Sequence, residues 1–351
     1  MTGLPSTAAQ ACFSIKPIDQ LPSGAWDKFV QANGGSFFHL SGWKTLFQDV
    51  FGFRTHYMAA ERQGEVAAIL PLVEQNSILF GRGLIAAPFC VEGGPLGSEG
   101  GCRALEDAAK NLMRDRKASF IEFRSRSASR PGWQIKKDQY AIFKRPLAGD
   151  EAANLKAIPR KQRAVVRKAL ESGLVIQVHD NPRTFYPIYA RSVQNLGTPV
   201  FPLRYFERIC ELFKDRCEIV VVYEGATAVS AVLSFYYGDT VLPYYGGGLA
   251  AARRSGANDL MYWGVMCRAA TRGCTAFDFG RSKAGSGAFS FKKNWGFEPE
   301  WLEYEYWLAN GGTMPDNNAA SPKYAMMVDL WKRLPPWLAD RAGPQLIRHL
   351  N

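Results

Sequence analysis

One arrangement of apolar segments occurs twice in the sequence, and this repeat limits the possible folds more than any other feature. Residues 57–73 form two short apolar runs joined by a polar turn, and residues 219–237 repeat that pattern, so both predict a β-hairpin. Each hairpin precedes an apolar glycine-containing segment, a helix-like stretch and a further apolar strand, at residues 119–126 and 275–282. We infer an internal duplication and expect two modules of the α/β (α+β) class, each with a central twisted mixed sheet.

Length and composition agree with two buried modules. The chain has 351 residues, and roughly 150 residues per domain is typical, which suggests two domains. A hydrophobic fraction of 47% with 21% charged residues describes a globular protein rather than a disordered one. We predict an N-terminal domain over 1–150, a second domain over 151–310 that begins with a basic helix, and a loop with an amphipathic tail over 311–351.

The sequence shows no targeting or metal-binding signal. Residues 1–15 lack a basic stretch followed by an apolar one, and the longest apolar uncharged run, 225–238, is shorter than the roughly 18 residues of a membrane span. The seven cysteines form no C-x-x-C pair and the four histidines are far apart, so we expect free thiols and no metal site. We predict a cytoplasmic protein.

The charge predicts an anionic partner. The formal net charge is +11, which favours nucleic acid, an acidic membrane surface or a phosphorylated substrate. Residues 158–176 read as a helix that starts at Pro159 and ends at Gly173. Cations recur along one face of this helix, which is either a solvated face or a surface that contacts nucleic-acid phosphates. These cations are Arg160, Arg163, Arg167 and Lys168.

The tail after residue 322 alternates apolar and basic residues. Met327, Leu330, Trp331 and Leu334 recur at helical spacing. Packing against the body of the protein and lying on a membrane surface are both consistent with this pattern. A peripheral position at the inner membrane face therefore stays open.

Two phosphate-binding motifs are only partly present. Residues 280–285 give G-x-x-x-x-G, but Ser286 and Gly287 follow where a P-loop needs Lys and Ser/Thr. Residues 246–251 give G-x-G-x-x-A, with Asp278 near the end of the next strand, so a dinucleotide fold is an alternative. The hairpin that opens the unit argues against that alternative.

The order hairpin, strand, glycine loop, helix, strand, helix, strand resembles the GNAT acyltransferase fold. In that superfamily, backbone N–H groups and a helix N-terminus bind the phosphates of the acyl donor. The usual pattern is Q/R-x-x-G-x-G/A, and residues 253–258 match it in Arg253 and Gly256. The resemblance implies two tandem GNAT-like domains.

Five further blocks resemble the FemAB family, and more closely its branch associated with exosortase and PEP-CTERM systems. They are LGTPVF (196–201), PYYGGG (243–248), ANDLMYW (257–263), FDFGRSK (277–283) and FKKNWGFEP (291–299). Well-studied FemAB proteins transfer an amino acid from aminoacyl-tRNA to the peptide of a cell-wall precursor. The branch is linked instead to exopolysaccharide and cell-envelope genes.

The resemblance implies an acyltransferase or aminoacyltransferase that forms an amide on a cell-envelope or exopolysaccharide precursor. No permanently bound cofactor is implied, and the acyl donor would be aminoacyl-tRNA or acyl-CoA. Two alternatives remain open. One is a coenzyme A-dependent N-acetyltransferase, and the other is a non-catalytic protein that binds tRNA or glycan on the same fold.

Amide formation needs a neutral amine, a place for the developing oxyanion and anchors for anionic substrates. Asp278 lies between two phenylalanines on an apolar strand, where it could accept the proton of the amine or cap the next turn. Lys292 occupies the lysine of the family's F-K element and would stabilise negative charge on the reacting carbonyl or a phosphate. These two residues are the predicted catalytic pair.

The remaining candidates would bind substrate. Arg281, Lys283 and Lys293 would anchor phosphate or form a solvated cationic loop, and Tyr244 and Tyr245 would line an acceptor groove or belong to an aromatic core. The predicted substrate-binding residues are Tyr244, Tyr245, Gly247, Arg253, Asn258, Arg281, Lys283 and Lys293.

Overall fold

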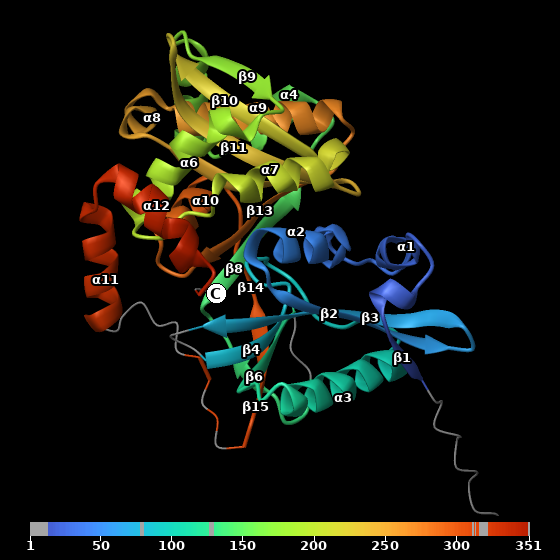
Figure 1. The fold of residues 1–351 in the computed structure, drawn as a ribbon. Helices are drawn as coiled ribbons and strands as arrows, with labels where there is room; N and C mark the ends of the chain where they lie inside the picture. Colours follow the sequence, from blue (N-terminus) through green and yellow to red (C-terminus); the bar gives the residue numbers. More distant parts are fainter. Residues whose placement is uncertain are drawn as a thin grey trace, which may run out of the picture.

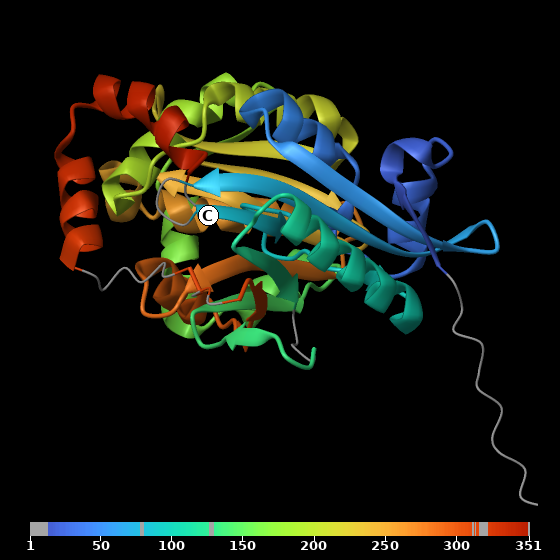
Figure 2. The same cartoon turned by 60° about the horizontal axis from the view of Figure 1, so that its bottom comes forward.

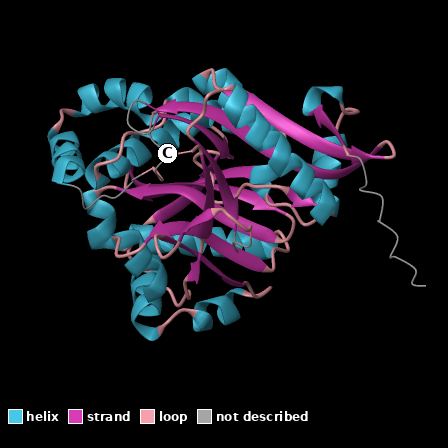
Figure 3. Cartoon of the chain, turned by 90° about the horizontal axis from the view of Figure 1, so that it is seen from below, coloured by secondary structure: helices cyan, strands magenta, loops and turns pink. Residues whose placement is uncertain are grey.

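The computed structural model describes residues 13–77, 81–125, 130–310, 312, 314–315 and 322–349, with side chains from 326 onward in the last range. These residues form two mixed β-sheets surrounded by helices (Figures 1 and 3). The expected fold class, with two mixed sheets, is therefore confirmed.

The first sheet has the strand order β1-β2-β3-β4-β6-β15-β7, with β5 paired to β3. Its antiparallel hairpin β2–β3 continues into β4, and β4 runs parallel to β6. The strands are β1 (Ser14–Pro17), β2 (Arg54–Arg62), β3 (Glu65–Ser77), β4 (Gly81–Ala86), β5 (Leu96–Gly97), β6 (Phe120–Ser125), β7 (Gln134–Lys136) and β15 (Glu303–Leu308).

The second sheet repeats this plan with the order β14-β8-β13-β12-β11-β10-β9. Here the hairpin β10–β11 continues into β12, and β12 runs parallel to β13. The strands are β8 (Tyr140–Pro146), β9 (Val175–His179), β10 (Cys217–Glu224), β11 (Thr227–Tyr237), β12 (Thr240–Gly248), β13 (Ala276–Lys283) and β14 (Glu300–Trp301). The predicted hairpins at 57–73 and 219–237 correspond to β2–β3 and β10–β11.

α3 packs on the first sheet and α9 on the second, whereas α2 and α7 pack against each other between the two sheets (Figure 1). The predicted helix-like stretches correspond to α3, α5 and α9. The helices are α1 (Ala25–Ala32), α2 (Gly42–Phe51), α3 (Glu99–Asp115), α4 (Glu151–Ala157), α5 (Arg160–Leu170), α6 (Pro182–Leu196), α7 (Leu203–Leu212), α8 (Ala250–Ser255), α9 (Ala257–Thr271), α10 (Gly287–Asn294), α11 (Pro322–Arg333) and α12 (Pro336–Ile347). Short 3₁₀ helices are η1 (Ile18–Gln20), η2 (Phe37–His39) and η3 (Lys214–Arg216).

Each half of the chain contributes one strand to the sheet of the other half. β8 precedes residue 150 but pairs with β13 in the second sheet, whereas β15 follows the second sheet in sequence and pairs with β6 in the first. The division between the sheets therefore does not coincide with the boundary that we predicted at residue 150. β8 lies between β13 and β14, and β15 lies between β6 and β7, so long-range pairing rather than local pattern decides this exchange.

One hydrophobic core continues from the first half into the second. Trp43 of α2 is fully buried, and its indole lies 5.4 Å from the ring of Phe213 and 6.1 Å from that of Phe235, measured between centroids. The Trp43 Nε1–H group donates to the carbonyl of Phe37 at 3.0 Å, which satisfies the polar atom of the buried ring. The two sheets are therefore held by shared aromatic packing as well as by exchanged strands.

The tail packs on the body of the protein through part of its surface. Trp331 of α11 is buried and its Nε1–H group donates to the carbonyl of Thr198, while Gly343 of α12 lies against Val200. Figure 2 shows both helices at one edge of the molecule. Met326, Leu330 and Trp337 remain exposed, so the apolar face of the tail is only partly covered. None of the helices in the described part of the chain has the length and apolar character that crossing a bilayer requires.

The shared core predicts a large effect of a single substitution. We expect Trp43→Ala to lower the free energy of unfolding by about 3–5 kcal/mol, because it removes a fully buried indole from contacts with both halves. Urea unfolding followed by circular dichroism measures this, and Trp301→Ala, at a residue that is 43% exposed, is the control with a smaller loss. A loss below about 1 kcal/mol for Trp43→Ala would contradict a core shared by both halves.

Candidate active site

The parallel strands β12 and β13 separate soon after they begin. They pair at Thr240↔Ala276 and Val241↔Phe277, and no further pairing between them occurs in the described residues. Past Val241, the edge of β12 that faces β13 therefore lacks a strand partner. Backbone N–H groups along such an edge remain available to a ligand.

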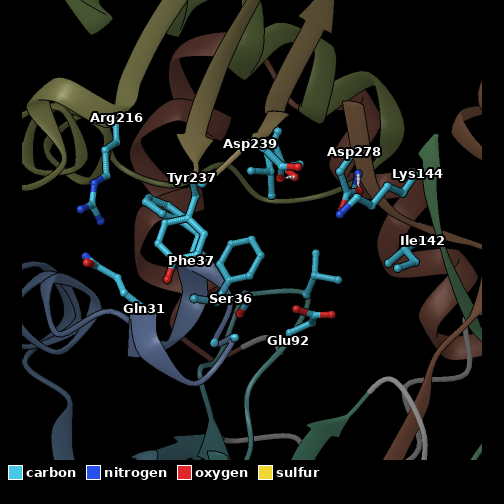
Figure 4. A pocket seen from close by; sticks show the side chains of 18 residues that line it. Gln31, Ser36, Phe37, Glu92, Ile142, Lys144, Arg216, Tyr237, Asp239 and Asp278 are labelled. Carbon is cyan, nitrogen blue, oxygen red and sulfur yellow. Dashed lines mark hydrogen bonds between the residues drawn. The ribbon is translucent and has the colours of Figure 1, made fainter. Parts of the chain in front are cut away.

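A cleft of about 870 Å³ opens at the start of this separation. One wall comes from the first half, through residues 31–38 with Val91 and Glu92, and the other comes from β8, β12, β13 and the residues before β12. Figure 4 shows Arg216 and Tyr237 at one end of the cleft and Asp278 beside Lys144 at the other. The cleft thus presents charges of both signs together with aromatic rings.

Asp278 lies on the wall of the cleft, at a bulge in β13. The register between β13 and β8 shifts between Asp278 and Arg281, and Gly280 in the bulge has φ +66°, which favours glycine. The Gly280 N–H group donates to Asp278 Oδ1 at 2.7 Å. Asp278 therefore stabilises the turn, as one of our two interpretations expected, and the same carboxyl group borders the cleft. Its role as a base stays a prediction.

Lys292 approaches the same bulge from α10, whose first turn is capped by the Ser286 hydroxyl. The buried Lys292 Nζ donates to the carbonyls of Phe279, Gly280 and Arg281 at 2.7, 3.0 and 3.1 Å. An ammonium group has three hydrogens, so these carbonyls use all of them. In this structure Lys292 holds the bulge and does not line the cleft, and its contact with a reacting carbonyl stays a prediction.

Burial changes the protonation of Lys292. Loss of hydration lowers the pKa of Lys292 to about 7, while the negative charge of Asp278 opposes this shift. The two predicted catalytic residues therefore meet at one bulge, Asp278 from β13 and Lys292 from α10, and influence each other electrostatically. The structure brings them together although 14 positions separate them in the sequence (292 minus 278).

Arg281 connects the bulge to the first sheet. Its Nη1 donates to the Tyr304 hydroxyl at 2.8 Å, and its guanidinium lies 4.8 Å from the ring centroid of Tyr140. The Tyr304 hydroxyl in turn donates to the carbonyl of Val91 at 2.9 Å. Arg281 is thus engaged in packing between β13 and the exchanged strand β15. Lys283 is half-buried and Lys293 exposed, which leaves both able to meet a bound anion.

The predicted tyrosines lie in the aromatic core, as one interpretation expected. The Tyr245 and Tyr205 hydroxyls form a hydrogen bond of 2.8 Å, and the Tyr244 hydroxyl donates to the carbonyl of Phe89 at 3.2 Å. Tyr244 also stands against Gly280, where a Cβ would be 3.7 Å from its ring. Contact between these tyrosines and an acceptor stays a prediction.

Gly247 and Asn258 have packing roles in this structure. A Cβ at Gly247 would lie 2.6 Å from the Cβ of Ser192 on α6, so only glycine allows this close approach. The Ser230 hydroxyl donates to Asn258 Oδ1 at 2.8 Å, which ties the start of α9 to β11. The Gly247 contact sets the position of α6 against β12, and the Asn258 contact sets the position of the α9 N-terminus relative to the sheet.

The predicted phosphate patch is brought together by α5. Its four cations line a shallow hollow of about 370 Å³ on the surface. Gly256, between α8 and α9, packs against Val165 and Ala169 of α5, so the basic helix runs beside the α9 N-terminus. Arg253 on α8 is exposed near this junction. The cations are Arg160, Arg163, Arg167 and Lys168.

Several cleft residues were not predicted from the sequence. Lys144 reaches the cleft because β8 is exchanged into the second sheet, and Arg216 comes from the turn before β10. Phe37 and Glu92 come from the first half of the chain. No local motif marks these residues, and only knowledge of the long-range pairing would have found them.

Comparison with known proteins agrees with this geometry. Residues 159–293 match the model of a family described as an acetyltransferase (GNAT) domain. The solved structure of FemX is similar, with 16% identity and a TM-score of 0.66, covering 90% of this chain and 100% of FemX. No curated protein sequence matches the chain.

Two further solved structures share the fold. A tandem GNAT protein from the clavulanic acid biosynthesis pathway has 14% identity and a TM-score of 0.53, covering 84% of this chain and 98% of that one. The C-terminal domain of a putative lysylphosphatidylglycerol synthetase from Agrobacterium fabrum has 14% identity and a TM-score of 0.54, covering 82% and 92%. The fold is that of tandem GNAT proteins, and FemX shares it over its full length.

The environment of Lys292 predicts a pH dependence of stability. Its pKa of about 7 in the folded protein lies below its ordinary value of 10.5, so the unfolded chain binds more protons between these values. The contribution of Lys292 to the free energy of unfolding should therefore rise with pH from about 7 to 10.5, by up to about 1.4 kcal/mol per pH unit.

Urea unfolding at pH 7, 8 and 9 tests this for the wild type and for Lys292→Met. The free energy of unfolding of the wild type, relative to that of Lys292→Met, should increase as the pH rises. Lys293→Met, at the exposed neighbouring position, serves as the control and should follow the wild type. Parallel curves for the wild type and Lys292→Met would contradict the prediction.

Proposed function

We propose that the protein is an acyltransferase that forms an amide bond, and that the acceptor amine binds in the cleft beside Asp278. The observation that carries this proposal is the separation of β12 from β13 directly beside a cleft that Asp278 borders. Both strands lie within residues 159–293, the segment that matches an acetyltransferase (GNAT) domain. Acyl transfer needs such an opening, where a donor and an acceptor can meet across the strands.

The proposed reaction is attack of a neutral amine on the activated carbonyl of the donor. The C–N bond forms, the bond to the leaving oxygen or sulfur breaks, and the amine proton passes through Asp278 to the leaving group. The unpaired N–H groups of β12 would stabilise the oxyanion. Lys292 would act by holding the bulge that positions Asp278. In a second version of this proposal, Lys292 would also contact the oxyanion directly.

Aminoacyl-tRNA is our first candidate for the donor. The exposed cations of α5 beside the α9 N-terminus support a polyanionic donor, and the sequence blocks that resemble FemAB proteins support the same choice. Arg253, Lys283 and Lys293 would anchor its phosphates. Acyl-CoA is the second candidate, which the match to an acetyltransferase domain supports.

A cell-envelope or exopolysaccharide precursor is the proposed acceptor. The resemblance to FemAB-like proteins of exosortase and PEP-CTERM systems supports this class. The exposed apolar residues of the tail helices, Met326, Leu330 and Trp337, would allow contact with the inner membrane face, where such precursors are built. The main body would then work in the cytoplasm.

The test measures transfer of labelled acyl groups into an amide. Purified protein is incubated with an extract of envelope precursors and either total tRNA charged with ¹⁴C-amino acids or ¹⁴C-acetyl-CoA. Label that resists mild base counts as amide. We expect Asp278→Asn to lower turnover by roughly 10²- to 10⁴-fold, with partial recovery at high pH where the amine is already neutral.

Asp107→Asn is the matched control, because Asp107 is an exposed carboxylate on α3, away from the cleft. It should retain wild-type turnover. Equal turnover of Asp278→Asn and wild type would remove Asp278 from the mechanism. Binding of tRNA or glycan by a wild type that shows no transfer would favour the non-catalytic alternative.

A further inference from the structure

A second pocket, separate from the cleft, lies at the end of the first sheet. It has a volume of about 520 Å³ and shares no lining residue with the cleft. Its walls come from the start of β2, the end of β3, the start of β4, the end of α3 and the chain after α12. Four separate elements of the first half and the tail therefore meet at this one hollow.

The pocket has a large excess of positive charge. Five cationic side chains line it against the carboxylates of Glu74 and Asp115, which leaves a formal charge of +3 (five minus two). His56 also meets Glu74, but burial lowers its pKa, so it adds little charge near neutral pH. The cations are Arg54, Arg82, Arg116, Lys117 and Arg348.

Contacts among the described residues leave this excess uncompensated. Glu74 is shared by three guanidinium groups, at 2.8 Å from Arg116, 3.6 Å from Arg82 and 3.8 Å from Arg54. Arg82 Nη1 also donates to the carbonyl of Arg116 at the end of α3, at 2.7 Å. Each guanidinium has five N–H donors, so most of these donors remain available.

The tail completes the pocket. Gln75 Nε2 donates to the carbonyl of Arg348 at 2.9 Å, and the Ser77 hydroxyl donates to the carbonyl of His349 at 2.6 Å. Arg348 itself donates to the carbonyl of Phe51 at 3.3 Å. These contacts hold a cation from the end of the chain beside three arginines of the first sheet and α3. Like charges that line one pocket repel one another, and a bound anion would relieve this repulsion.

We propose that this pocket binds a phosphate-bearing anion. Guanidinium groups bind phosphate oxygens through paired hydrogen bonds, and a charge of +3 matches a diphosphate better than a single carboxylate. The volume falls within the range of small-molecule sites. The phosphate belongs either to a soluble compound or to a lipid headgroup. The proposal does not depend on acyl transfer, because no cleft residue takes part.

Calorimetric titration of the full chain with inorganic pyrophosphate tests the proposal. We expect Arg54→Gln combined with Arg82→Gln to weaken affinity by at least about tenfold, because two charged hydrogen-bond donors are lost. Glu74→Gln should strengthen affinity, because it removes the carboxylate that competes with the ligand. Opposite effects from the two changes would not arise from general destabilisation, and circular dichroism confirms that each variant is folded.

Arg62→Gln is the matched control, since Arg62 is an exposed arginine at the far end of β2 and outside the pocket. Its affinity for pyrophosphate should equal that of the wild type. Absence of pyrophosphate binding by the wild type, or unchanged affinity in the folded double variant, would overturn the proposal.

A vesicle experiment then separates the two sources of phosphate. Flotation with vesicles of phosphatidylglycerol and phosphatidylcholine compares the wild type with the double variant, with and without pyrophosphate. Binding that requires Arg54 and Arg82 and that pyrophosphate displaces identifies a lipid headgroup. If vesicle binding does not depend on these arginines while pyrophosphate binding does, the ligand is a soluble phosphate compound.

Discussion

The exchange of β8 and β15 between the two sheets is the constraint on which the rest of the structure depends. β8 pairs with β13 on both sides of its bulge, and β15 pairs with β6 from Glu303 to Leu308. Neither sheet is complete without a strand from the other half. The cleft wall that carries Lys144 and Asp278 therefore exists only when both halves have folded together.

Buried polar contacts stabilise this arrangement and restrict it to one register. Arg281 of β13 donates to Tyr304 of β15, and Tyr304 donates to the carbonyl of Val91 in the first half. Arg124 of β6, which pairs with Glu122 on the same buried strand, also donates to the carbonyl of Cys90 at 2.8 Å. Buried charges are costly without such partners, so a shift in strand register would be strongly unfavourable. The bulge of β13, whose carbonyls accept hydrogen bonds from Lys292, is thereby fixed relative to the cleft.

Local pattern in the sequence was enough to predict the repeated modules but not their connection. The turn at Gln63 and Gly64, both with positive φ, and the apolar alternation around it predict β2–β3 without any tertiary information. Pairing of β8 with β13 involves strands more than 100 residues apart, and no local propensity encodes that choice.

The same difference between local pattern and long-range pairing explains which residues of the candidate site could be predicted. Asp278 was identified because its position on an apolar strand is a local property, and the structure places it on the cleft wall. Lys144, Arg216 and Glu92 were missed because they reach the cleft only through tertiary pairing. The Lys292 contact with three carbonyls was also missed, because the sequence does not fix the position of α10 relative to the bulge.

In the proposed reaction, an acyl donor meets the edge of β12 that faces away from β11, beside the cleft. Hydrogen–deuterium exchange with mass spectrometry tests this directly, in the presence of charged total tRNA or acetyl-CoA and in their absence. One of these donors should slow the exchange of amides in residues 242–248 by at least about tenfold, while α3 stays unchanged, because only the edge of β12 gains hydrogen-bond partners. Unchanged exchange at residues 242–248 with both donors, or protection confined to other elements, would contradict the placement of the reaction at this opening.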